Sequence, residues 1–231
     1  MKVFENFNYL PLSGDPIFLK ETARLVLGET LFKDLEPYTA KQGTVGGVNG
    51  IYMWARLIKV IEKKPVIIIG DPTWKNHIQI LSYFGFTIVE YPQLTKNKMF
   101  NLLALKQKLI KYPKSYVLLQ GGPCHNPTGL NPNRSEWKEL AKVIKAYKQQ
   151  VLVDYAYMGL GDDLDSDSFC IRYFLKEKIP TSVVVSYSKN MTLYQHRTGG
   201  LLILTSSRKE KEQTEKLNMM KPGEKIVVAP Q

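Results

Sequence analysis

Runs of consecutive apolar residues, separated by stretches of helical periodicity, most constrain how this chain can fold. Strands that are apolar on both faces are typical of parallel sheets covered by helices, whereas half-exposed strands alternate apolar and polar residues. We therefore expect an α/β fold with a largely parallel sheet between two helix layers, a three-layer α/β/α arrangement. The expected strands cover residues 65–70, 86–91, 116–120, 151–153, 182–187 and 201–204.

The stretches between these runs carry helix signals. Asp15 followed by Pro16 is a typical helix start, and Gly28 is a typical stop. Asn133 with Glu136 three residues later resembles a capping box. Charged residues of both signs around residues 208–212 indicate an exposed helix face. The expected helices cover residues 16–27, 31–35, 51–61, 76–84, 102–110 and 134–148.

Polar and glycine-rich segments lie at the expected strand ends and helix starts. Open α/β sheets bind their ligands outside the carboxyl ends of the strands. Taken singly, each segment has an ordinary explanation, such as a plain glycine turn, a packed tryptophan, a turn-rich loop or a capping aspartate. The four segments are residues 46–50, 71–77, 121–129 and 154–159.

Lys189 lies just past the strand at residues 182–187. A lone lysine in a loop is most often a solvated charge, but a lysine amine also forms Schiff bases with carbonyl cofactors. Arg197 follows eight residues later, shortly before Gly199 and Gly200, and its planar guanidinium suits a phosphate. A lysine for an aldehyde and an arginine for a phosphate together suggest pyridoxal 5′-phosphate (PLP).

Residues 186–190 and Arg197 resemble the S-x-S-K-N…R segment of aspartate and aromatic amino-acid aminotransferases, which are fold type I PLP enzymes. The four other segments resemble motifs of that family in the family's order: G-G-[ST]-G-A, N-P-[ST]-W-x-N-H, C-x-H-N-P-T-G and D-x-A-Y-x-G. The resemblance implies a PLP-transferase-like large domain. We expect it to cover residues 1–231, without the family's C-terminal small domain.

The resemblance also implies roles for single residues. Lys189 would hold PLP and act as general base and acid, Trp74 would stack on the pyridine ring, and Tyr157 would donate to the phenolic oxygen. These three are the catalytic candidates. Asp154 would bind the pyridine nitrogen, with His125 supporting that aspartate. The cofactor-binding set is Tyr9, Gly47, Val48, Trp74, Asn126, Asp154, Tyr157, Ser186, Ser188, Lys189 and Arg197; no metal ligand is assigned.

Two departures from the family pattern lie in the glycine segment. Val48 stands where the family usually has a hydroxyl, which removes one hydrogen bond to the phosphate, and Asn49 replaces a glycine. Both lead us to expect reduced cofactor affinity. Tyr9 matches a family tyrosine that reaches the cofactor phosphate of a partner subunit, so the resemblance implies a homodimer with shared sites.

The composition limits the cell compartment and the partners. Cys124 and Cys170 are the two cysteines, too few for a disulfide framework, and they fit a reducing compartment. No apolar run approaches the length of a membrane span, and the first residues lack the core of a signal peptide. We expect a cytoplasmic protein. The net charge of +11 attracts anions, but the lysines are scattered and nucleic-acid binding is not favoured.

The predicted function is a PLP-dependent transamination between an L-amino acid, of aspartate or aromatic type, and a 2-oxo acid. The substrates are small molecules, and no membrane partner is expected. The family's arginine for the substrate carboxylate has no counterpart here. A PLP-binding truncated or degenerate relative without full transaminase activity is therefore an open alternative. A basic α/β binding module that keeps the motifs as relics is a third.

Overall fold

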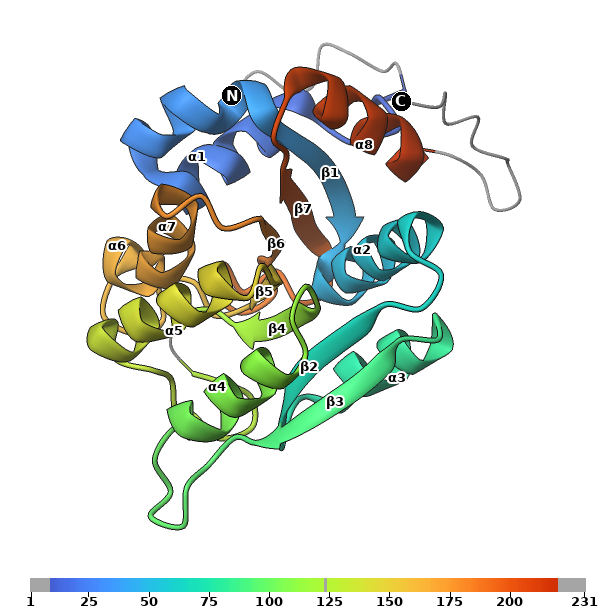
Figure 1. Cartoon of the computed structure of the whole chain (residues 1–231). Helices are drawn as coiled ribbons and strands as arrows, with labels where there is room; N and C mark the ends of the chain where they lie inside the picture. The colour runs from blue at the N-terminus through green and yellow to red at the C-terminus, as the bar shows by residue number, and fades with distance from the viewer. Residues whose placement is uncertain (1–8, 123, 220–231) are drawn as a thin grey trace.

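The computed structural model describes residues 9–122 and 124–219; the ends of the expected domain, residues 1–8 and 220–231, and residue 123 lie outside the described residues. Figure 1 shows a central sheet between two layers of helices. In chain order the elements are α1 (Pro16–Leu35), η1 (Glu36–Tyr38), β1 (Thr39–Val45), α2 (Gly46–Ile61), β2 (Val66–Asp71), α3 (Lys75–Tyr83), β3 (Thr87–Pro92), α4 (Leu102–Lys111), β4 (Tyr116–Gln120), α5 (Arg134–Ala146), β5 (Gln150–Tyr155), α6 (Leu164–Asp167), α7 (Phe169–Lys176), β6 (Thr181–Ser186), β7 (Thr198–Leu204) and α8 (Arg208–Met219).

The sheet has seven strands in the order β1-β7-β6-β5-β4-β2-β3. The pairs among β2 to β6 are parallel, while β7 runs antiparallel to both β6 and β1. All six expected strands are present, and the expected three-layer fold with a largely parallel sheet is confirmed. Two antiparallel steps make β1 parallel to β6, so the carboxyl end of β1 lies at the same edge of the sheet as that of β6.

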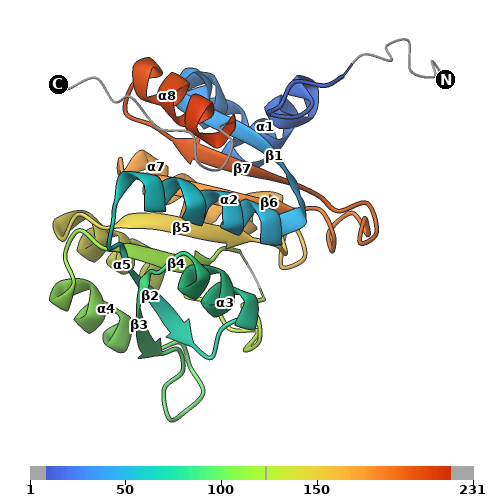
Figure 2. The ribbon, with the colours of Figure 1, turned by 90° about the vertical axis from the view of Figure 1, so that its right-hand side faces the viewer.

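Alternation along the strands sends apolar side chains to both faces of the sheet. Ile67 and Ile69 of β2 pack with α2 and α3 residues on one face, whereas Ile68 between them packs on the other. That other face is covered by α1, α4, α5 and α7. Figure 2 shows α2 and α3 lying together in front of the sheet. Continuous apolar runs are therefore required because both faces are buried.

The structure corrects one expected helix boundary and adds elements that the sequence pattern does not predict. Thr39–Val45 lacks a continuous apolar run, so the sequence pattern does not predict β1, which forms a strand by antiparallel pairing with β7. Helix α2 begins at Gly46 rather than at residue 51. The short helices α6 and α7 were not expected.

The stop at Gly28 is a local break between two helical stretches that together make up α1. Gly28 has a non-helical φ of 72°. A Cβ at this position would lie 3.0 Å from the guanidinium carbon of Arg172, whose Nε donates to the carbonyl of Val26. The expected helix end is therefore confirmed, and α7 supplies the cation that caps it. No helix in the described part of the chain is long and apolar enough to cross a membrane.

Candidate functional site

Five loops converge on one edge of the sheet because of the strand order. The carboxyl ends of β1, β2, β4, β5 and β6 and the start of β7 all lie there. The chain moves outward from β2 to β3 and then returns to β4 on the other side of β2, with α3 and α4 on opposite faces. Such a reversal leaves a crevice between the two strands, where open α/β sheets place their ligands.

A cavity of about 240 Å³ opens at this edge. It brings together ten of the eleven residues assigned to the cofactor from the sequence and adds Gln120, Ala156 and Tyr194. The lining consists of Gly47, Val48, Trp74, Gln120, Asn126, Asp154, Ala156, Tyr157, Ser186, Ser188, Lys189, Tyr194 and Arg197. Tyr9 is the exception, because its side chain is fully exposed and does not line the cavity.

One end of the cavity is built for an anion. Nη1 of Arg197 donates to Oγ of Ser188 and to the carbonyl of Tyr194, both at 3.2 Å. A Cβ on Gly46 would lie 2.7 Å from Nη2 of Arg197, so only glycine lets the guanidinium reach the start of α2. The first backbone N–H groups of this helix receive no side-chain cap. A guanidinium beside uncapped N–H groups and the positive helix end makes a binding site for a phosphate.

Asn49 has a structural role in the same turn. Its Oδ1 accepts a hydrogen bond from the backbone N–H of Val45 at 3.1 Å, which ties the end of β1 to the first turn of α2. Val48 lines the cavity with an apolar side chain. Of the two departures in the glycine segment, Asn49 thus stabilises the turn, whereas Val48 supplies no hydrogen bond to a ligand.

A buried carboxylate lies in the middle of the cavity. Asp154 is the fifth residue of β5 and is 7% exposed. Its Oδ2 lies 2.8 Å from Nε2 of the fully buried His77, whose Nδ1 lies 2.9 Å from Oγ1 of Thr73. Trp74 packs edge-on against the same imidazole, with ring centroids 5.3 Å apart. A flat ring between Trp74 and this carboxylate would meet a stacking surface and a negative charge.

The residue behind Asp154 is His77, which corrects the role expected for His125. Nδ1 of His125 instead lies 2.8 Å from Oγ1 of Thr128. Asp154 points to the same face as Leu152, the face covered by α3, while His125 lines a separate small cavity beside Trp137. Burial, reinforced by the nearby His77, lowers the pKa of His125 to about 4.

The sequence held a signal for where His77 lies, though not for its contact with Asp154. A helix starts after Trp74, and a residue three positions later lies on the same face of its first turn. The edge-on contact of Trp74 with His77 follows from this spacing.

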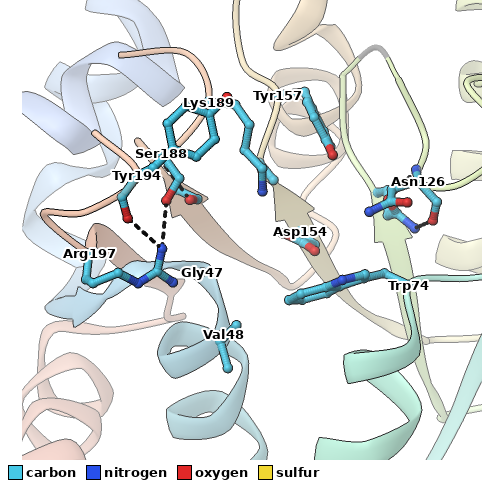
Figure 3. A pocket seen from close by; sticks show the side chains of 13 residues that line it. Gly47, Val48, Trp74, Asn126, Asp154, Tyr157, Ser188, Lys189, Tyr194 and Arg197 are labelled. Carbon is cyan, nitrogen blue, oxygen red and sulfur yellow. Dashed lines mark hydrogen bonds between the residues drawn. The ribbon is translucent and has the colours of Figure 1, made fainter. Parts of the chain in front are cut away.

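Lys189 points into the centre of the cavity. In Figure 3 its amine lies between Arg197 on one side and Asn126 on the other, above Asp154 and Trp74. The Nζ atom is 5.2 Å from the ring centroid of Tyr157. Burial and then the charge of Asp154 raise the pKa of the Tyr157 hydroxyl, which favours a phenol that donates a hydrogen bond.

These contacts define the kind of molecule that the cavity can hold. An amine faces a flat slot, a buried carboxylate lies under it, and an anion site closes one end. An aromatic aldehyde with a phosphate tail would satisfy all three features. The described residues offer no group of three or more histidine, cysteine or acidic side chains for a metal ion.

Comparison with known proteins identifies the family pattern over most of the chain. A family model described as aminotransferase class I and II matches residues 4–222. The aromatic-amino-acid aminotransferase of Paracoccus denitrificans is 31% identical over 205 residues, which are 88% of this chain and 51% of that protein. The aspartate aminotransferase of Haemophilus influenzae is 32% identical over 205 residues, 87% of this chain and 51% of that protein.

Solved structures give the same result for the fold. The aromatic-amino-acid aminotransferase of Burkholderia pseudomallei, covalently bound to pyridoxal phosphate in its crystal structure, superposes with a TM-score of 0.88 at 28% identity. The match covers 93% of this chain and 54% of that one. The chain therefore spans about half the length of the relatives that it matches.

Proposed function

Because this chain belongs to the aminotransferase class I and II family, we propose that its cavity binds PLP and serves transamination. The reaction would transfer an amino group between an L-amino acid of aspartate or aromatic type and a 2-oxo acid. The observation that carries the proposal is that Lys189, Asp154 and Arg197 line one cavity of about 240 Å³. These are the three side chains needed for the aldehyde, the pyridine nitrogen and the phosphate.

The residues present fit this cofactor. The uncapped start of α2 and the guanidinium of Arg197 offer donors for the phosphate, together with Ser186, Ser188 and the Gly47 amide. A Cβ on Gly47 would lie 3.3 Å from Cβ of Ser186, so a side chain there would crowd this cradle. Trp74 offers the stacking surface, and the buried Asp154 suits a protonated ring nitrogen.

PLP, when bound, would supply an aldehyde for the amino group and a protonated pyridine that accepts electron density from the substrate Cα. The protein's own groups would do the remainder. The amine of Lys189 would take the proton from the substrate Cα and return it as an acid. Tyr157 and Asn126 would donate hydrogen bonds to the phenolic oxygen and so hold the ring in one orientation relative to Lys189.

His77 and Thr73 would keep the carboxylate of Asp154 in place. The hydrogen bonds of 2.8 Å and 2.9 Å in this chain fix the imidazole, and the imidazole fixes the carboxylate. Because the His77–Asp154 pair is buried, little water competes for the carboxylate. The negative charge of Asp154 would therefore be weakly screened at a ring nitrogen. We assign His77 this positioning role in place of His125.

The proposal includes a second copy of the chain. Tyr9 is fully exposed and away from the cavity of its own chain, as expected for a side chain that acts on a partner's site. Small-molecule substrates and a homodimer with shared sites are part of the proposed function, as is a cytoplasmic location. We further propose that the chain forms a single cofactor-binding domain.

A second candidate function is PLP binding without full transamination. Arg197 is the one arginine that lines the cavity in the described part of the chain, and it lies at the anion end beside α2. No second guanidinium in this lining is left for a substrate carboxylate. Without such a clamp, productive orientation of the substrate would be lost, at a cost of roughly several kcal/mol.

Trapping of the cofactor on the protein tests the proposal. The 231-residue chain is incubated with PLP and treated with borohydride, and the labelled peptide is located by mass spectrometry. We expect one adduct on Lys189 that is absent from Lys189→Ala. Label spread over surface lysines, or equal labelling of the variant, would refute PLP binding at this site.

Single-turnover reactions then separate the two candidates. Aspartate, glutamate and phenylalanine are each added to the PLP-loaded protein, and the 2-oxo acid is quantified. Stoichiometric product supports transamination. An adduct on Lys189 without product supports the second candidate.

A further inference from the structure

Gln120 is a polar residue at the end of a buried strand that the motifs leave without a role. It ends β4 and lies in register with Asp154 of β5. Residues in register on neighbouring parallel strands project to the same face, so Gln120 lies on the α3 side, beside the carboxylate. It also lines the cavity.

The side-chain amide of Gln120 pairs with the backbone of Asn126 in both directions. Oε1 of Gln120 accepts from the Asn126 N–H at 2.7 Å, and Nε2 donates to the Asn126 carbonyl at 2.9 Å. These two bonds resemble those between paired strands. They fix the peptide groups on both sides of the Asn126 Cα and therefore the direction of its side chain.

The same amide reaches the hydrogen-bond chain that ends at Asp154. Nε2 of Gln120 donates to Oγ1 of Thr73 at 3.4 Å, a longer contact than the other two. A carboxylate only accepts, so His77 donates to Asp154 through Nε2, and in the neutral imidazole Nδ1 accepts from the Thr73 hydroxyl. All donations then run toward Asp154, and Gln120 is the first donor.

We propose that Gln120 is a positioning residue that joins the loop carrying Asn126 to the Thr73–His77–Asp154 chain. It thereby sets the separation between the group assigned to the phenolic oxygen and the group assigned to the ring nitrogen. The inference rests on the proposed function, because both assignments concern PLP. Glutamate at this position would keep the acceptor for the Asn126 N–H but could donate to neither Asn126 nor Thr73.

Two variants of glutamine test this role. Gln120→Leu removes the three contacts and keeps most of the side-chain volume. Gln149→Leu is the matched control, since Nε2 of Gln149 also makes two hydrogen bonds, to the backbone carbonyls of Leu109 and Tyr112, and Gln149 does not line the cavity. Urea unfolding measures the stability of both variants, so that effects on PLP can be compared at equal folded fraction.

The first readout needs no cofactor. Amide hydrogen exchange of the free protein should show loss of protection at Asn126 in Gln120→Leu, and unchanged protection there in Gln149→Leu. Gln120→Glu should lose less protection at this amide, because it keeps the acceptor. Unchanged exchange at Asn126 in Gln120→Leu would overturn the proposal, whatever the protein does with PLP.

The second readout is the dissociation constant for PLP. We expect about a tenfold increase in Gln120→Leu, the effect of losing two hydrogen bonds that hold a ligand group. Gln149→Leu should stay within about twofold of the parent protein. In the double variant Gln120→Leu/Asn126→Ala the loss of PLP affinity should be smaller than the sum of the two single losses, since Gln120 acts in part through Asn126. Additive losses would show that Gln120 does not act through Asn126 and would overturn the proposal.

If the parent protein forms no adduct at Lys189, the proposed function fails, and hydrogen exchange alone then decides whether Gln120 anchors Asn126. The two failures are therefore distinguishable.

Discussion

Asp167 offers the sharpest test of how the loop carrying Tyr157 is held. The carboxylate is 6% exposed and accepts three backbone hydrogen bonds from the loop that follows β5. Oδ2 accepts from Gly159 at 2.8 Å and from Gly161 at 3.1 Å, and Oδ1 accepts from Asp162 at 3.3 Å. Without these contacts, three N–H groups of a sharply turning segment would need water or another acceptor.

Asp167→Asn replaces one carboxylate oxygen by an NH2 group, and the resulting loss of stability can be estimated from these contacts. If the amide oxygen takes the place of Oδ2, two hydrogen bonds survive but lose the charge, at about 1 kcal/mol for the pair. The amide nitrogen then faces the N–H of Asp162, and the third bond is lost, at about another 1 kcal/mol. We expect unfolding to be easier by about 2 kcal/mol, or a melting temperature lower by about 4–8 °C.

Asp163→Asn is the control, because Asp163 also accepts three hydrogen bonds, from the amides of Asp165 and Ser166 and the hydroxyl of Ser166. Its side chain is exposed and caps α6, a position where asparagine serves as well as aspartate. Urea unfolding followed by tryptophan fluorescence should show no change for this variant. The reasoning fails if Asp167→Asn is as stable as Asp163→Asn.

Two further predictions concern the cofactor and the pH. Val48→Thr should lower the dissociation constant for PLP about fivefold, since a hydroxyl at the start of α2 adds one hydrogen bond to the phosphate. Val60→Thr, at the exposed end of the same helix, is the control. Equal PLP affinities of the two variants would contradict the prediction. For His125, the pKa of about 4 in the folded protein lies below the value of about 6.5 in an unfolded chain, so protons bind preferentially to the unfolded state between these values. Acidification from pH 7 to pH 5 should therefore destabilise the parent protein by up to about 2 kcal/mol more than His125→Gln, measured by urea unfolding at each pH; parallel pH profiles would contradict it.

Most of the sheet could be predicted from the sequence, because strands buried on both faces must be apolar at every position. The same reasoning failed for β1. Thr39–Val45 mixes small and polar residues and has no apolar run, and only its pairing with β7 makes it a strand. A pattern of apolar residues indicates which side chains of a segment are buried. The backbone pairing of an edge strand depends instead on the neighbouring strand.

The cofactor residues could be placed at one edge from their positions after strands. The histidine that contacts Asp154 could not be predicted in this way, because the family resemblance gave that role to His125, the residue beside Asn126. In the folded chain, strand alternation turns Asp154 toward α3 and His77, whereas the imidazole of His125 pairs with Thr128 of its own loop. The direction of a side chain on a strand depends on the register of the sheet, which a short sequence motif does not specify.

The sequence by itself determined the layers of this protein and the set of groups at its strand ends, since apolar runs and motif residues are local properties of the chain. The tertiary structure alone decided the partners of those groups: His77 for Asp154, Gln120 for Asn126 and Asp167 for the loop of Tyr157. These pairs join residues on separate elements. A hydrogen bond depends on ångström distances between its atoms, and only the packed sheet and helices fix distances of that precision.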